Sequence, residues 1–362
     1  MRNRWIRLAV MRWDPPRRGT RKGRRGFETR LRRSSTDGDV LTPKLSAAPA
    51  ASVVVRAPGK VNLALHVGGL GADGYHPLVT LFQAVDLYEI VTATQGRPGS
   101  GITIEVEGPG AEQVPTDASN LAYKTAALLA KHLGVRPDVK LKIEKSIPVA
   151  GGMAGGSADA AATLLACNNL WEPRPGRNKL GKSELLSLAA ELGSDVPFSL
   201  LGGTALGTGR GHLLNPIITR GQFHWAFGLS DHGLSTPAVY RKFDEINPEP
   251  EEIDNKPEPE LLRALVNGDA KALGKCLKND LQPAALELRP ELAKIIEIAQ
   301  AEKALGVIVS GSGPTVAALA KSKRHARSIA EKWRKAGVVT SAVTATAPAA
   351  GTQIYNPDNN VV

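Results

Sequence analysis

The sequence predicts an α+β protein of two domains, and three observations lead to this expectation. The chain has 362 residues, which is long enough for two domains that each bury a hydrophobic core. Segments with strand-like alternation and segments with helical spacing follow one another along most of the chain. Beyond about residue 215 the pattern changes, because a buried strand segment is followed by an acidic, proline-rich loop and two helical stretches.

We expect four regions: a disordered basic leader over 1–50, an N-terminal domain over 51–215, a C-terminal domain over 216–348 and a flexible tail over 349–362. The leader holds twelve Arg and two Lys against four acidic residues, so it carries +10 of the chain's net charge of +11. It has no sustained apolar period. We interpret it as an incidental extension, with an organelle transit peptide and an RNA-binding arm as alternatives.

The composition is that of a soluble globular protein, with 42% hydrophobic and 22% charged residues. No run of about 18 apolar residues occurs, so neither a membrane span nor a membrane partner is expected. The two cysteines, Cys167 and Cys276, predict no disulfide framework or metal site and are compatible with a cytoplasmic location. Outside the leader, 32 basic residues face 31 acidic ones, which argues against a nucleic-acid partner for the folded body.

In the N-terminal domain, "SVVVRAPGKVNLALHV" (52–67) predicts two strands around a tight Pro-Gly turn. A turn-rich loop and further strand material over 79–94 follow. Later segments predict a helix at 120–134, a strand at 139–150 and helices at 157–170 and 182–193. In the C-terminal domain we expect a strand at 223–231, helices at 259–280 and 290–304, two strands around a glycine-rich turn at 306–320, a helix at 322–336 and a strand at 338–344.

The segment "PVAGGMAGGSADAA" (148–161) places four glycines directly ahead of an alanine-rich helix, with Ser157 expected at the N-cap. Glycines expose backbone N–H groups, and a helix N-terminus carries partial positive charge, so the pair suits a phosphate. A Walker A loop does not fit because no lysine follows the glycines, and the glycine spacing differs from a dinucleotide fingerprint. Taken alone, the loop is equally compatible with a flexible segment before a capped helix.

This segment resembles the glycine loop with which the GHMP kinases, the family of galactokinase, homoserine, mevalonate and phosphomevalonate kinases, surround the phosphates of ATP. "APGKVNLAL" (57–65) is similar to the first motif of that family, and "VSGSGPTV" (309–316) to its third. The resemblance covers residues 52–316. It implies an N-terminal domain with the ribosomal S5 domain 2-like fold and a C-terminal GHMP domain of ferredoxin-like α+β type, with the active site in the cleft between them.

The resemblance also implies residue roles. Asp195 would be the catalytic base and Lys60 its catalytic partner, whereas alone they would be read as a helix N-cap and a surface lysine. The implied ATP-binding residues are Lys145, Gly152, Gly155, Gly156 and Ser157. The third motif would close over phosphates or substrate with Ser312 and Gly313 nearest, a plain turn being the alternative. Mg²⁺ should accompany ATP, although no carboxylate cluster predicts metal-binding residues in the protein.

Three further segments, "GADGYHPLVTLFQAVDL" (71–87), "GSDVPFSLLGGTALGTGRG" (193–211) and "LSTPAVY" (234–240), resemble one kinase of this family in particular. Its small-molecule alcohol substrate carries a cytidine diphosphate group, and it serves an isoprenoid-precursor pathway that does not use mevalonate. The resemblance implies that substrate is bound by Asn62, Tyr75, His76, Thr236 and Tyr240. Two alternatives remain: a sibling kinase acting on homoserine or a mevalonate derivative, and a non-enzymatic RNA-binding protein, since S5-like domains bind RNA.

Overall fold

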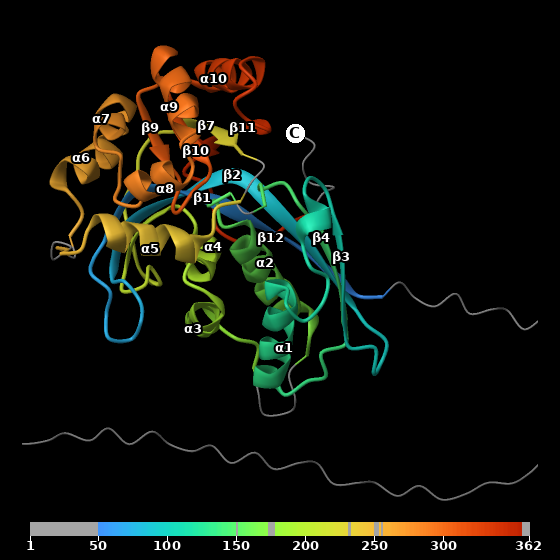
Figure 1. Cartoon of the computed structure of the whole chain (residues 1–362). Helices are drawn as coiled ribbons and strands as arrows, with labels where there is room; N and C mark the ends of the chain where they lie inside the picture. Colours follow the sequence, from blue (N-terminus) through green and yellow to red (C-terminus); the bar gives the residue numbers. More distant parts are fainter. Residues whose placement is uncertain are drawn as a thin grey trace, which may run out of the picture. The chain divides into compact units, whose positions relative to one another are not determined.

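The computed structural model describes residues 50–149, 151–172, 178–230, 233–249, 253–254 and 256–356 (Figure 1). The leader up to residue 49 lies outside these residues, so the expectations about it stay predictions. The strands are β1 (Ser52–Val67), β2 (Leu78–Gln95), β3 (Ile102–Glu107), β4 (Val139–Glu144), β5 (Thr204–Thr208), β6 (Leu213–Pro216), β7 (Phe223–Leu229), β8 (Lys278–Asn279), β9 (Gly306–Val309), β10 (Val316–Ala320), β11 (Ser341–Ala347) and β12 (Gln353–Ile354).

The helices are interspersed among these strands without regular alternation, as in an α+β protein. They are the short 3₁₀ helix η1 (Ala111–Gln113) and the α-helices α1 (Leu121–Leu133), α2 (Gly155–Leu170), α3 (Lys182–Leu192), α4 (Val196–Leu201), α5 (Thr236–Ile246), α6 (Pro259–Asn267), α7 (Ala270–Lys275), α8 (Gln282–Leu288), α9 (Leu292–Ala301) and α10 (Lys323–Lys335).

The strands form two sheets. The first has the order β12-β1-β2-β4-β3 with β5, β6 and β8 attached, and the second has the order β11-β7-β10-β9. The chain passes from the first sheet to the second between Pro216 and Phe223, near the predicted boundary at 215. Because β8 and β12 return to the first sheet, the two halves of the chain are interlocked, and the domain division by sequence range stays a prediction.

Strand β1 corrects the first expectation, since Pro58 and Gly59 do not form a turn. They lie within one continuous strand at a shift in its register with β2. A bulge tolerates proline, which has no N–H for the ladder, and glycine, which lets other backbone approach. A Cβ on Gly59 would lie 3.3 Å from the carbonyl oxygen of Met153, and the N–H of Lys60 donates to that same oxygen at 3.1 Å. The bulge thus places Lys60 beside the glycine loop.

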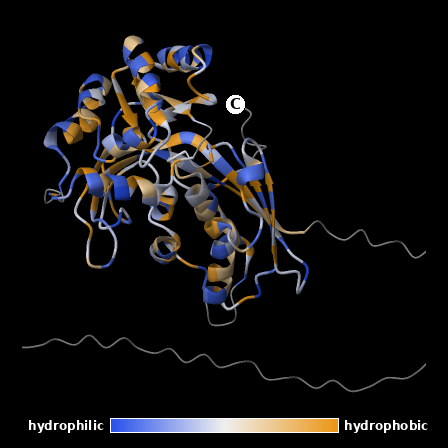
Figure 2. Cartoon of the chain, in the orientation of Figure 1, coloured by the Kyte–Doolittle hydropathy of each residue, from blue (hydrophilic) through white to orange (hydrophobic). Residues whose placement is uncertain are grey.

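Helix α2 begins two residues earlier than predicted. Ala154 is the N-cap with φ 63°, and Ser157 therefore lies inside the first turn, not at the cap. Ten residues of α2 are buried, because the helix packs against β1 and β2 on one side and α1, α3 and α4 on others (Figure 1). An alanine-rich sequence suits a helix enclosed in this way. Figure 2 shows the hydrophobic colouring of the sheet strands that α2 covers.

The helix expected over 259–280 is wrong as one continuous element. Gly268, with φ +68°, ends α6, and α7 and β8 follow as separate short elements. A Cβ on Gly274 would lie 2.2 Å from the carbonyl oxygen of Leu305, so the backbones approach too closely for any other residue. The tail is also more ordered than expected, because β12 pairs with β1 through Ile354 and Val55. Residues 357–362 lie outside the described part.

Candidate active site

One cavity of about 960 Å³ brings the predicted motifs together. Every residue that the sequence implicated lines it except Gly313: Lys60, Asn62, Tyr75, His76, Lys145, Gly152, Gly155, Gly156, Ser157, Asp195, Thr236, Tyr240 and Ser312. These residues come from β1, the loop before β2, the loop between β4 and α2, the start of α2, the turn before α4, α5 and the β9–β10 loop. Residues as far apart in sequence as Lys60 and Ser312 therefore line the same cavity.

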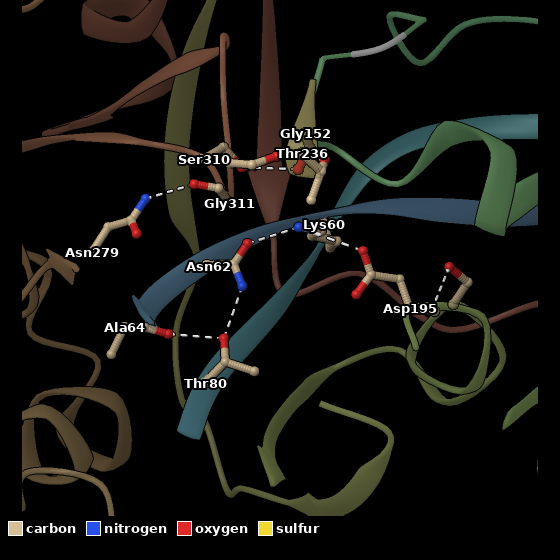
Figure 3. Close-up of polar contacts among 12 residues, drawn as sticks. Lys60, Asn62, Ala64, Thr80, Gly152, Asp195, Thr236, Asn279, Ser310 and Gly311 are labelled. Carbon is tan, nitrogen blue, oxygen red and sulfur yellow. Dashed lines mark hydrogen bonds and ion pairs between the residues drawn. The ribbon is translucent and has the colours of Figure 1, made fainter. Parts of the chain in front are cut away.

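Lys60 and Asp195 both line the cavity and point toward each other (Figure 3). The Nζ of Lys60 lies 3.7 Å from Oδ2 of Asp195 and donates to Oδ1 of Asn62 at 2.7 Å. The Nδ2 of Asn62 donates to the Thr80 hydroxyl at 2.8 Å, which donates to the Ala64 carbonyl at 2.9 Å. Asn62, itself fixed by Thr80, thus holds the buried ammonium group of Lys60 in one orientation.

Asp195 precedes α4, where an aspartate commonly caps the helix. Its side chain makes no capping hydrogen bond, and only its backbone carbonyl enters the helix, accepting from the N–H of Ser199 at 3.1 Å. The carboxylate turns toward Lys60 with 32% of the side chain exposed. The geometry therefore suits a carboxylate that meets a ligand in the cavity.

The glycine loop presents free backbone donors at the start of α2. Ala158 is the first residue whose N–H reaches the carbonyl four residues back, that of Ala154, at 2.9 Å. The N–H groups of Gly155, Gly156 and Ser157 precede it, and helix geometry gives them no such carbonyl. Since these three residues line the cavity, their donors and the helix dipole can receive an anion there.

The β9–β10 loop closes against the glycine loop. Gly152, with φ +69°, comes so near that a Cβ on it would lie 2.3 Å from the Ser310 carbonyl oxygen. The Ser312 hydroxyl and the Thr236 hydroxyl lie 2.9 Å apart. Asn279, which the sequence reasoning missed, donates to the carbonyls of Val309 and Gly311 at 2.8 Å each (Figure 3). Contacts with Gly152, Thr236 and Asn279 thus hold the β9–β10 loop in place. Gly313, in the same loop, does not line the cavity.

Lys145 lines the cavity, and its expected role in binding ATP stays a prediction. Its Nζ is 2.8 Å from Oε1 of Glu89 and 2.7 Å from Oδ2 of Asp159, and all three residues are buried. Burial, with the Asp159 charge adding, raises the pKa of Glu89 to about 7. The pKa of Lys145 is raised because its two carboxylates outweigh the effect of burial. The positive charge of Lys145 is therefore paired with the carboxylates of Glu89 and Asp159.

The other end of the cavity is aromatic. The rings of His76 and Tyr240 stack with centroids 5.0 Å apart. His76 Nδ1 lies 2.8 Å from the Gly68 carbonyl, which only accepts, so Nδ1 carries the proton, and Nε2 lies 3.5 Å from Oδ2 of Asp244. Burial, with Asp195 adding, raises the pKa of Tyr240 to about 12, so its hydroxyl stays neutral.

Tyr75 is 54% exposed, and the guanidinium of Arg210 lies over its ring at 4.4 Å. One face of Tyr240 is therefore covered by His76 and one face of Tyr75 by Arg210. The sequence reasoning missed Arg210 and Asp244. It also missed the segment from Gln113 to Leu121, which extends the cavity beyond the glycine loop. A signal in the sequence existed for Glu89, which with Asp86 is one of two acids in the strand segment 78–95.

Within the part of the chain that the structure describes, no group of three or more His, Cys, Asp or Glu side chains is arranged to hold a metal ion. Over the same residues, no helix is both long and apolar enough to cross a membrane.

Comparisons with known proteins identify the family to which the chain belongs. The family model for the GHMP kinases N terminal domain matches residues 120–203, and that for the GHMP kinases C terminal matches residues 261–339. A 4-diphosphocytidyl-2-C-methyl-D-erythritol kinase of Streptomyces avermitilis is 51% identical over 84% of this chain and 99% of its own length. One of Thermobifida fusca is 50% identical over 84% of this chain and 98% of its own.

A crystal structure of a 4-(cytidine 5'-diphospho)-2C-methyl-D-erythritol kinase aligns with a TM-score of 0.65 at 31% identity, covering 83% of this chain and 100% of that one. The α+β fold and the kinase family that the motifs predicted are thus confirmed. The chain belongs to the GHMP kinase family, in the branch of the 4-diphosphocytidyl-2-C-methyl-D-erythritol kinases.

Proposed function

We propose that the chain transfers the γ-phosphoryl group of ATP to the 2-hydroxyl of 4-diphosphocytidyl-2-C-methyl-D-erythritol, a step of the non-mevalonate pathway to isoprenoid precursors. The observation that carries the reaction type is the Lys60–Asp195 pair, which lies in one cavity with the anion-binding start of α2. The choice of acceptor rests on relatives about half identical over nearly their whole length, whose names specify that substrate.

In the proposed reaction the acceptor hydroxyl lies against Asp195. As its oxygen attacks the γ-phosphorus, its proton passes to the Asp195 carboxylate, and the bond to the β,γ-bridging oxygen breaks to release ADP. Lys60, buried and held by Asn62, stabilises the negative charge that develops on the reacting oxygens. The three N–H groups at the start of α2 hold the phosphates.

ATP is expected to enter with Mg²⁺, which neutralises phosphate charge in this chemistry. The described residues offer no cluster of ligands for the ion, so it would be held chiefly by phosphate oxygens. The Ser157 residue, in the first turn of α2 and lining the cavity, provides the hydroxyl best placed to assist.

The aromatic end of the cavity would bind the cytidine group. Tyr75 and Tyr240 each have one ring face covered by a neighbour, which leaves their other faces for a base between them. His76 and Asp244, whose Nε2 and Oδ2 lie 3.5 Å apart, would provide the polar groups that recognise the edge of the base. Thr236 and Asn62 would contact the polyol from opposite sides.

We further propose that the protein acts in the cytoplasm and that its folded body binds no nucleic acid. Its two cysteines are free, one of them buried, and the residues outside the leader are almost balanced in charge.

The decisive experiment compares acceptors with Mg-ATP: 2-C-methyl-D-erythritol carrying CDP, UDP or a bare phosphate, together with homoserine and phosphomevalonate. We expect strong preference for the CDP compound, because replacing the amino group by a carbonyl turns a donor into an acceptor and leaves polar groups unpaired. This preference should shrink in His76→Ala. Equal use of the bare phosphate, or faster phosphorylation of homoserine or phosphomevalonate, would assign the protein to a sibling kinase.

A further inference from the structure

Three buried charged side chains meet directly behind the glycine loop. Glu89, Lys145 and Asp159 are 0%, 4% and 3% exposed, and the ammonium of Lys145 contacts both carboxylates at 2.8 and 2.7 Å. They come from three elements: β2, the residue after β4, and the second turn of α2. The catalytic scheme above gives Glu89 no part, although a fully buried carboxylate is costly to maintain.

Glu89 does more than pair with Lys145. Its Oε2 accepts from the N–H of Ser146 at 2.9 Å, and its Oε1 accepts from the N–H of Ile147 at 3.2 Å. Ser146 and Ile147 are the first residues of the loop that leads to the glycines. The carboxylate therefore fixes the direction in which the chain leaves β4.

The loop also returns over the same carboxylate. A Cβ on Gly155 would lie 3.2 Å from Oε1 of Glu89 and 3.5 Å from Nζ of Lys145, so the first residue of α2 rests on the cluster. Oδ1 of Asp159 is buried without a partner among the described residues, and Asp159 lines the cavity. The cluster thus contacts the loop both at Ser146 and Ile147 and at Gly155. Through Asp159 it also lines the cavity in which an anion would bind.

We propose that Glu89 is a positioning residue for the nucleotide: by holding Lys145 and the N–H groups of Ser146 and Ile147, it sets the position of the loop that receives the ATP phosphates. It does not touch the nucleotide itself. The inference rests on the proposed function only in taking ATP as the ligand of that loop.

The substitution that tests this is Glu89→Gln, which keeps the side-chain size. An amide offers one oxygen where the carboxylate has two, and its NH₂ must face either the Lys145 ammonium or a backbone N–H, donor against donor. The loop must shift to relieve this contact. We expect a non-hydrolysable ATP analogue to bind roughly tenfold more weakly, as for loss of one charge-assisted hydrogen bond, and the KM for ATP to rise similarly. The KM for the acceptor should stay unchanged.

The matched control is Asp138→Asn. Asp138 is also buried, at 5% exposure, and accepts two backbone N–H groups, those of Gly99 and Gly101, at 3.0 Å each. Its turn contributes nothing to the cavity lining. This variant should lose thermal stability and bind the analogue as the wild-type protein does.

Wild-type affinity for the analogue in a folded Glu89→Gln protein would reduce Glu89 to a structural residue and overturn the proposal. If Glu89→Gln does not fold, Glu89→Asp decides instead: its charge is kept but its reach is one methylene shorter, so analogue binding must weaken, and unchanged binding overturns the proposal. Failure of the proposed function is recognised separately, because it changes which acceptor the wild-type protein uses and leaves analogue binding intact.

Discussion

The two ends of the cavity offer different kinds of chemical groups, backbone N–H groups at one end and side chains at the other. At the phosphate end, the candidate ligands are backbone N–H groups of α2, supported by a charged cluster in which no residue is more than 4% exposed. At the aromatic end they are side chains on loops and on α5, and Tyr75 keeps 54% of its surface exposed. Backbone donors recognise any phosphate, whereas side chains on loops can be exchanged without disturbing the core. The phosphate end therefore suits the shared nucleotide and the aromatic end the individual acceptor.

The largest effect should come from Asp195→Asn, which affects the chemistry between the two ends. Turnover should fall roughly 10²–10⁴-fold, the usual contribution of a general base. Because the Asp195 carboxylate is paired with Lys60 and, among the described residues, has no hydrogen bond with the glycine loop, affinity for an ATP analogue should hold. Steady-state kinetics and analogue binding measure the two quantities. Near-normal turnover in a folded variant would mean that Asp195 has no role as a base.

A second, smaller effect should separate the two ends. Tyr240→Ala removes one aromatic wall, and stacking of a base on a ring is worth about 1–3 kcal/mol, or on the order of 5- to 150-fold in acceptor affinity. The KM for ATP should hardly change. Comparable losses for both substrates would show that the two ends are not independent.

The buried cluster also predicts a pH dependence of stability. The pKa of Glu89 is about 7 in the folded protein against 4.5 when unfolded, so the folded state binds more protons between these values. The free energy of unfolding should therefore decline as pH rises from about 4.5 to 7, by at most about 1.4 kcal/mol per pH unit for this one group.

Denaturant titrations from pH 4.5 to 8 on wild-type protein and Glu89→Gln measure this contribution. The variant should show a shallower decline, since its amide does not titrate. Parallel curves would mean that Glu89 is ionised throughout the range.

The smallest effect is expected at the rim of the aromatic end. Arg210→Ala removes the guanidinium from the Tyr75 ring, an exposed cation–π contact worth about 0.5–1 kcal/mol. Acceptor KM should rise about two- to fivefold, with the KM for ATP unchanged. The surface variant Arg263→Ala is a suitable control, and an equal change in it would remove Arg210 from the site.

Much of this molecule could be predicted from local patterns. The helices α1, α3 and α10 lie within a residue or two of their expected positions, because each has its own apolar spacing and end signals. The long helix over 259–280 failed, since Gly268 with φ +68° ends α6 and Lys278–Asn279 pair with β1, a partner that no local pattern reveals. The turn at Pro58 failed for the same reason: whether Pro-Gly reverses the chain or bulges a strand depends on the partner strand.

The sequence by itself determined the kinase family, the glycine loop and a set of site residues that, apart from Gly313, all line one cavity, because these depend on short strings whose order along the chain is visible. Only the tertiary structure decided that Lys145 is neutralised by Glu89 and Asp159, that Asn279 fastens the third motif and that His76 stacks on Tyr240. Those partners lie 14 to 164 residues apart in sequence. A buried ion pair or ring stack forms only where packing brings such residues together and excludes water. A local sequence pattern carries no information on which distant residues will meet in space.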